Sequence, residues 1–213
     1  MLMALLLLGA SAARMALQGE KAARADRDRR VAFHAAEEAL MDAENDIEGS
    51  AAMPARSAMF APDSTLGFAS GCGVGAASAN LGLCLAAGED DIPVWQEVDL
   101  ADVQAATMKS VSYGQFTGAS MPTGQGFLPF QRPRYIIEVL PYTGAGNDAG
   151  PAISYFYRVT AIGFGARDTS EVVLQTYYRK PAVPLAAKFK MPARRMSWRE
   201  IANWRELHAA AKK

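Results

Sequence analysis

The sequence is poor in the residue types that most often carry chemistry. Among 213 residues there are two cysteines and two histidines. Cys72 and Cys84 cannot by themselves complete a four-ligand zinc site, and His34 and His208 lie far from them in sequence. His34 lies between charged residues of a predicted helix, and His208 lies near the end of the chain. This composition gives no support for a metal centre.

The motifs of common enzyme families are missing as well. No Gly-x-Ser-x-Gly, His-Glu-x-x-His or EF-hand pattern occurs. The glycine-rich run GCGVGA, at 71–76, is followed by no Lys-Ser/Thr pair, and no clear strand precedes it. It therefore gives little support for a nucleotide-binding loop. We predict a non-catalytic protein without a cofactor.

The chain also lacks an excess of charge of either sign. Lys plus Arg and Asp plus Glu both number 22, so the formal net charge is +0. Because binding to a nucleic-acid backbone requires a surplus of positive charge, we do not expect nucleic acid as a partner. The length favours one main domain with an appendage, and it suffices to bury a sizeable core.

The sequence also lacks an apolar run long enough to span a membrane at its N-terminus. Residues 1–13 are uncharged and rich in Leu, Met and Ala. As a helix they reach only about 20 Å, which is short of a hydrocarbon core of about 30 Å. They are either a cleaved signal peptide, for which GASAA supplies small residues, or the start of a retained helix. The usual basic n-region is absent and the helical pattern continues past Arg14, so we favour the retained helix.

A long helix is the strongest positive signal. Between Arg14 and Gly49 there is no proline, and only Gly19 interrupts strong helix formers. The pattern predicts one helix of about 45 residues that ends at Gly49 and Ser50. Its last part places apolar residues on one face, at spacings of three and four. These packing residues are Phe33, Ala36, Leu40, Ala43 and Ile47.

Residues 50–133 are rich in predicted loops. Cys72 and Cys84 lie in a Gly/Ala/Ser-rich segment, where they form either a disulfide in an oxidising compartment or two free thiols in a reducing one. An exported chain favours the disulfide. The segment PVWQEVDL, at 93–100, is typical of a short edge strand or an ordered connection anchored by Trp95.

Three strands are predicted further along, at 134–141, 153–165 and 171–180. These segments are rich in β-formers and are separated by turn residues. The short connections predict an antiparallel sheet of at least three strands within residues 134–185. A sheet with one apolar face needs a cover, and the amphipathic end of the helix can supply it. The fold class is therefore α+β, with a long N-terminal helix packed on an antiparallel sheet.

The last segment, residues 186–213, is basic. Ser197 and Glu200 match a capping box, which predicts a short C-terminal helix. This tail either contacts anionic lipid or an acidic partner, or rests its tryptophans on the domain, and we favour the second interpretation. The residues that would make the contact are Trp198, Ile201 and Trp204.

The predicted organisation has four parts. They are the helix at 1–49, the loop-rich region at 50–133, the sheet at 134–185 and the basic tail at 186–213.

Several segments together resemble the PilX family of minor pilins, which take part in type IV pilus assembly. They are AFHAAEEALMDAE at 32–44, the Cys72–Cys84 segment followed by PVW, the strands RYIIEVLP and YRVTAIGFGARDTSEVVLQTYYRK, and the terminal SWRE. The likeness covers most of the chain and is weakest at 100–133. It implies a pilin-like ladle.

The resemblance also exposes a difference at the N-terminus. In that family the helix begins with a short basic leader, a Gly-Phe cleavage point and a glutamate a few residues later, and none of these is present here. We expect Met1 to be an internal start, with roughly a dozen upstream residues that would complete a membrane span. The membrane or filament-core part of the helix would then include Leu2, Leu5, Leu6, Leu7 and Leu8.

The function that the resemblance implies is that of a minor pilin that primes or modifies the filament through its N-terminal helix. The helix would lie in the bacterial inner membrane, with the head in the periplasm, and later in the pilus at the cell surface. The implied partners are the major pilin, other minor pilins, the inner-membrane assembly platform and a tip adhesin. The alternatives are a pilus-borne adhesion or aggregation factor, a type II secretion pseudopilin and, more distantly, a soluble secreted enzyme or carrier.

Overall fold

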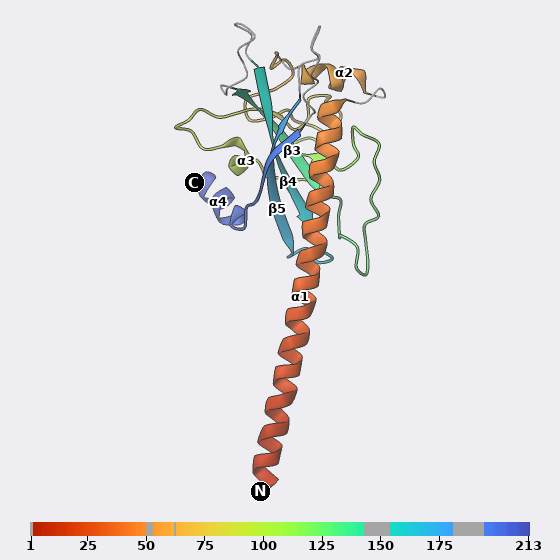
Figure 1. The fold of residues 1–213 in the computed structure, drawn as a ribbon, viewed down its shortest axis with the longest axis vertical. Helices are drawn as coiled ribbons and strands as arrows, with labels where there is room; N and C mark the ends of the chain where they lie inside the picture. The colour runs from red at the N-terminus through yellow and green to blue at the C-terminus, as the bar shows by residue number, and fades with distance from the viewer. Residues whose placement is uncertain (1, 50–52, 62, 143–153, 181–193) are drawn as a thin grey trace.

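A single helix, α1 (Leu2–Glu48), runs the length of the molecule and ends against a β-sheet (Figure 1). The computed structural model describes residues 2–49, 53–61, 63–142, 154–180 and 194–213. Side chains are described from Ser11 onward, apart from those of Tyr142, Ser154 and Arg194. We call residues 11–27 of α1 the stem, and the described residues from 28 onward the head.

The helix is continuous for 47 residues and passes through Gly19 without a break. A single glycine weakens a helix by about 1 kcal/mol relative to alanine, which a long helix tolerates. α1 ends at Glu48 and is followed by Gly49, whose φ of 96° lies in the left-handed region that glycine adopts without a steric penalty. The Gly49 N–H donates to the carbonyl of Asn45 at 3.1 Å, as in a helix C-cap.

The sheet has six strands, and its order is β1-β3-β4-β5-β6, with β2 also paired to β3. The strands are β1 (Leu83–Leu85), β2 (Val111–Ser112), β3 (Arg134–Tyr142), β4 (Ser154–Phe164), β5 (Glu171–Arg179) and β6 (Arg194–Glu200). Neighbours from β3 to β6 are antiparallel, whereas β1 runs parallel to β3. The sheet is therefore mixed.

The two faces of the sheet support two separate cores, because alternate side chains of a strand point to opposite faces. On β4, Tyr157, Val159 and Ala161 belong to the core beneath α1. Ile162 and Phe164 belong to the core on the other face. Figure 1 shows α1 lying over the sheet and α3 and α4 at its other side.

Short helices complete the head. They are α2 (Pro54–Ser57), the 3-10 turn η1 (Ala58–Phe60), α3 (Val94–Glu97) and α4 (Trp204–Ala211). The segment around Trp95, predicted as an edge strand or ordered connection, forms α3. Trp95 and Trp204 are both buried, and the indole N–H of Trp204 donates to the carbonyl of Trp95 at 3.2 Å. This bond joins α4 to α3.

The α+β prediction is confirmed: the structure has the long N-terminal helix, the sheet and the short C-terminal helix. The sheet is larger than the antiparallel unit predicted within 134–185. Strands β1 and β2 come from the region predicted to be loops, and β6 comes from the tail. The two early strands are three and two residues long, too short to produce a recognisable alternation.

The predicted capping box is wrong. Ser197 and Glu200 lie in β6, and the C-terminal helix begins at Trp204. The backbone from Arg194 to Glu200 pairs with β5, so ladder hydrogen bonds and the packing of alternate side chains override the local helix signal.

Candidate assembly interface

The contact between α1 and the sheet is unusually close at β4. Ala32, Ala36, Ala39 and Ala43 are fully buried on the helix face that meets the sheet. A Cβ atom built on Gly163 would lie 2.1 Å from the Ala32 carbonyl oxygen and 2.3 Å from the Ala36 nitrogen. The backbones of α1 and β4 can approach this closely only because Gly163 has no side chain.

The structure places the predicted packing residues along this contact. Ala36, Leu40, Ala43 and Ile47 are fully buried in the core between α1 and the sheet. Phe33 is partly buried and packs against the same core. Its ring also meets that of Trp198 edge to face, with centroids 5.7 Å apart. The apolar face thus extends from the sheet to the edge strand β6.

A buried carboxylate, Asp28, fixes the helix to the β4–β5 turn. It accepts hydrogen bonds from the Ala166 N–H at 2.6 Å, the Arg167 Nε at 3.1 Å and the Ser170 hydroxyl. Burial alone raises the pKa of Asp28, but these three bonds outweigh burial and lower it below its ordinary value. The first residue of the head is therefore held in its ionised form.

A second carboxylate, Asp46, forms a buried ion pair with Arg56 of α2. The side chains of Asp46 and Arg56 are 2 % and 1 % exposed, and the Arg56 Nη2 to Asp46 Oδ2 distance is 2.7 Å. The Tyr135 hydroxyl also donates to Asp46, at 3.1 Å. The remaining Arg56 nitrogen, Nη1, donates to the carbonyls of Ala79 and Leu81 at 2.9 and 2.7 Å. One side chain thereby ties α1, α2 and the disulfide loop together.

The third buried carboxylate, Asp42, holds the loop after β2. It accepts hydrogen bonds from the Gly114 N–H at 2.7 Å and from the Thr117 hydroxyl. Burial nevertheless raises the pKa of Asp42, and the neighbouring charge of Asp46 acts in the same direction.

Sequence reasoning did not identify these three anchoring carboxylates. Their positions did carry a signal. Asp28, Ala32, Ala35, Ala39, Asp42 and Asp46 follow one another at spacings of four and three. Such spacing places them on one helical face, and the alanines of that face are buried.

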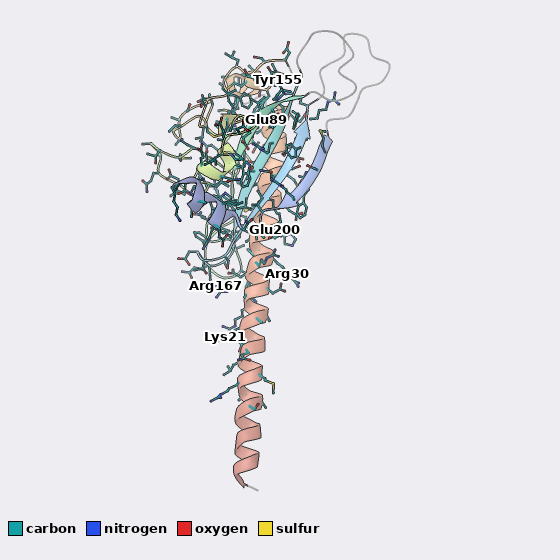
Figure 2. All side chains as sticks on the ribbon, turned by 90° about the vertical axis from the view of Figure 1, so that its left-hand side faces the viewer. Lys21, Arg30, Glu89, Tyr155, Arg167 and Glu200 are labelled. Atoms are coloured by element: carbon teal, nitrogen blue, oxygen red, sulfur yellow. A yellow bond between two sulfur atoms is a disulfide. The ribbon has the colours of Figure 1, made fainter. Side chains whose placement is uncertain are left out.

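The stem contrasts with this anchored half. Every residue from 11 to 27 is exposed, including Met15 at 64 % and Leu17 at 58 %. Glu20 pairs with Arg24 on this surface. Figure 2 shows Lys21 on the stem, and Arg30, Arg167 and Glu200 where α1 enters the head. The stem therefore has surface available along its whole described length.

The five leucines predicted for a membrane or filament-core helix lie at the start of α1. The backbone of Leu2, Leu5, Leu6, Leu7 and Leu8 is helical, and their side chains lie outside the described part. Within the described residues, none of the helices combines the length and the apolar character that a membrane crossing requires.

Cys72 and Cys84 are joined as a disulfide in the structure. Cys84 lies in β1, which pairs with β3, so the bond ties the glycine-rich loop to the sheet. Both cysteines are buried in the core opposite α1, next to Trp95.

The predicted tail residues divide into two environments. Ile201 and Trp204 are buried in the core opposite α1. Trp198 is 44 % exposed on β6 and contacts Phe33. The basic residues Lys188 and Lys190 lie outside the described residues.

Two surface cavities of about 230 Å³ lie at the end of the head nearest the stem. One lies between the starts of β5 and α4, and the other is lined by Arg24, Arg27, Phe127 and Arg167. Across the described ranges, no group of three or more His, Cys, Asp or Glu side chains is placed to hold a metal ion.

The comparison with protein families decides the relationship. The family model described as type IV pilus assembly protein PilX C-term matches residues 80–180, which run from just before β1 to just after β5. This segment belongs to the PilX family. The match confirms the resemblance over strands β1 to β5, which include the strands against which α1 packs. A search of curated proteins and a search of solved structures each found no match.

The match of this segment to the PilX family implies involvement in type IV pilus assembly, together with other pilus components at the cell envelope. The family is a structural component of that assembly.

Proposed function

We propose that this chain is a minor pilin that primes or modifies a type IV pilus through α1. The observation that carries the proposal is the division of one unbroken helix into two halves. Its second half is fixed to a PilX-type sheet, and its first half extends beyond the head with all its described side chains exposed (Figure 1).

The stem surface favours packing against other helices. Most helical stability in proteins comes from packing of an apolar face, and the large apolar side chains of the described stem, Met15 and Leu17, are exposed. Complete burial of a side chain such as Met15 or Leu17 stabilises a complex by about 1.5–3 kcal/mol. A filament core made of neighbouring pilin helices would supply that burial.

The head is fixed to α1 by three anchoring carboxylates. Asp28, Asp42 and Asp46 hold three successive parts of the head to α1. Because of these anchors, the orientation of the head follows the orientation of the helix. A subunit inserted by its stem would therefore present its head in a defined direction to the next subunit.

The proposed location is the inner membrane with the head in the periplasm, and then the pilus. The disulfide supports this location because such bonds persist in oxidising compartments. The proposed partners are the major pilin, other minor pilins and the assembly platform, with a tip adhesin as a further candidate. The apolar start of α1 would hold the subunit in lipid before assembly.

The test is a charge placed on the stem. Leu17→Glu should leave the thermal stability of the head unchanged, because Leu17 lies on the stem and is 58 % exposed. In cells that lack the wild-type gene, the variant should fail to restore surface filaments, whereas the matched Leu17→Ala variant should restore most of them. Electron microscopy and immunoblots of sheared filaments measure both effects.

Other outcomes identify the alternatives. Normal filaments containing the Leu17→Glu protein would contradict a role for the stem in the filament core. Cells without the gene that keep normal filaments but fail to cluster or adhere would indicate an adhesion or aggregation factor. Loss of protein secretion with normal pili would indicate a type II secretion pseudopilin.

A further inference from the structure

The sheet ends in an open edge at β6. This strand pairs with β5 on one side, and among the described residues no other strand pairs with it. An unpaired edge presents backbone donors and acceptors that another extended chain can meet. Glu200, labelled in Figure 2, is the last residue of this strand.

The direction of the free backbone groups follows from two hydrogen bonds. The Ile201 N–H donates to the Val173 carbonyl at 2.8 Å, and the Thr176 hydroxyl donates to the Ser197 carbonyl at 2.5 Å. Residues of an antiparallel strand alternate between facing the partner and facing away. Ser197 and Ile201 face β5, so the backbone groups of Trp198 and Glu200 face outward.

The edge is held in an extended form by α1. Glu200 pairs with Arg29 at 2.5 Å, and Arg195 pairs with Glu44 at 2.6 Å. Between them, Trp198 rests on Phe33. An incoming strand would therefore meet a preformed template, which lowers the entropic cost of binding.

The side chains of β6 define the chemistry of the partner. Met196 and Trp198 are 50 % and 44 % exposed and offer apolar contact. The strand carries three arginines and one glutamate in its sequence RRMSWRE. Within the described part of the chain, Arg199 bonds an uncharged group, the amide oxygen of Gln175, at 2.7 Å. Its positive charge is therefore available to a carboxylate.

We propose that the outer edge of β6, from Ser197 to Glu200, is a docking site for an extended acidic segment of a partner protein. The segment adds a strand to the sheet, its backbone pairing with Trp198 and Glu200. Apolar side chains of the segment contact Trp198, and acidic side chains lie near Arg199. Strand addition is an established form of peptide recognition, in which backbone bonds give affinity and side chains give specificity.

Arginines and bulges are also devices that protect a sheet edge from pairing. The bulge in β6 lies at Met196, because Ser197 pairs with Tyr177 and Arg195 pairs with Tyr178. It leaves the backbone from Ser197 to Glu200 in regular register. The proposed site is confined to this regular part.

Synthetic peptides test the site on the purified full chain. Of the three tryptophans, Trp95 and Trp204 are buried, so Trp198 is the one that a ligand on the edge can reach. The acidic peptide Ac-VEVEVEV-NH2 should produce a saturable change in tryptophan fluorescence. Ac-VKVKVKV-NH2 should bind at least tenfold more weakly. The acidic peptide N-methylated at two adjacent central residues should not bind, because each edge of the peptide loses a backbone donor.

Variants of the protein complete the test, with calorimetry as a second measure of binding. Arg199→Glu should weaken binding of the acidic peptide at least tenfold. The matched Arg132→Glu variant should bind as the wild type does, because Arg132 lies just before β3, and β4 and β5 separate β3 from β6. No binding at millimolar peptide would show that the edge is protected, and equal binding of acidic, basic and N-methylated peptides would show non-specific adsorption. Either result overturns the proposal, and neither depends on filament assembly.

Discussion

The buried Asp46–Arg56 pair offers the strongest test of how α1 is held. Replacing Arg56 with alanine leaves Asp46 buried without its counter-charge, and leaves the carbonyls of Ala79 and Leu81 without their donor. Removing one partner of a buried ion pair destabilises a protein by about 3–5 kcal/mol. We expect Arg56→Ala to fall in this range.

The effect is large enough to measure by heat denaturation. For a domain of this size, 1 kcal/mol corresponds to roughly 2–4 °C in Tm. The expected decrease in Tm is therefore roughly 6–20 °C, which circular dichroism or calorimetry of the purified chain can measure. The matched control is Arg24→Ala, which breaks the exposed pair with Glu20 and should cost about 0.5 kcal/mol or less.

A second substitution separates the lost pairing from lost packing. Asp46→Asn removes the charge that Arg56→Ala leaves behind, so the double variant should be more stable than the sum of the two single changes predicts. We expect a coupling of at least about 1 kcal/mol. A loss below about 1 kcal/mol for Arg56→Ala, or additive effects, would refute the assignment of this pair as a buried anchor.

Three further predictions concern the head and the stem. Reduction of the Cys72–Cys84 bond, which closes a loop across 12 positions, should lower the free energy of unfolding by about 3 kcal/mol, measured in urea with and without reductant; an unchanged midpoint would contradict this. Gly163→Ala should destabilise the chain by about 1–3 kcal/mol or more, because the new Cβ meets the α1 backbone. Gly19→Ala should stabilise α1 by about 1 kcal/mol, because a Cβ at Gly19 has nothing within 4 Å. If calorimetry found Gly163→Ala more stable than Gly19→Ala, that result would be evidence against the close approach of α1 and β4. The pKa of Asp28 is lowered in the folded state, so its stabilisation is present above the unfolded pKa of about 3.9 and is lost as the pH falls through the folded pKa. Asp28→Asn should therefore be less stable than the wild type at pH 7 and lose less stability between pH 5 and pH 3. Parallel curves of unfolding free energy against pH for the two proteins would exclude this contribution.

The helix and the central strands could be predicted because their patterns are long. An apolar face repeated from Phe33 to Ile47 indicates a packed helix. The β-formers at 153–165 likewise predict a strand, and the structure confirms it as β4 (Ser154–Phe164). Each of these elements contains enough residues for local preference and tertiary packing to agree.

The parts that escaped prediction depend on pairing across the sequence. The tail from Arg194 to Glu200 contains a valid local helix signal, but its neighbour is β5, and the sequence does not reveal that neighbour. Asp42 and Asp46 likewise resemble solvated helix residues until their donors are known. Those donors, in Gly114, Thr117 and Arg56, lie on other elements. A buried carboxylate can be recognised only when its partners are placed beside it.

The spacing of the anchors along α1 has a mechanical consequence. Asp28 and Asp46 are 18 positions apart, which is about 27 Å of helix. A tension applied along the helix axis would act in shear, and at the same time, on the Asp46–Arg56 ion pair, on the hydrogen bonds of Asp28 and Asp42, and on the buried alanines that face β4. Peeling would instead break them one after another. A subunit built in this way resists an axial pull better than a sideways one.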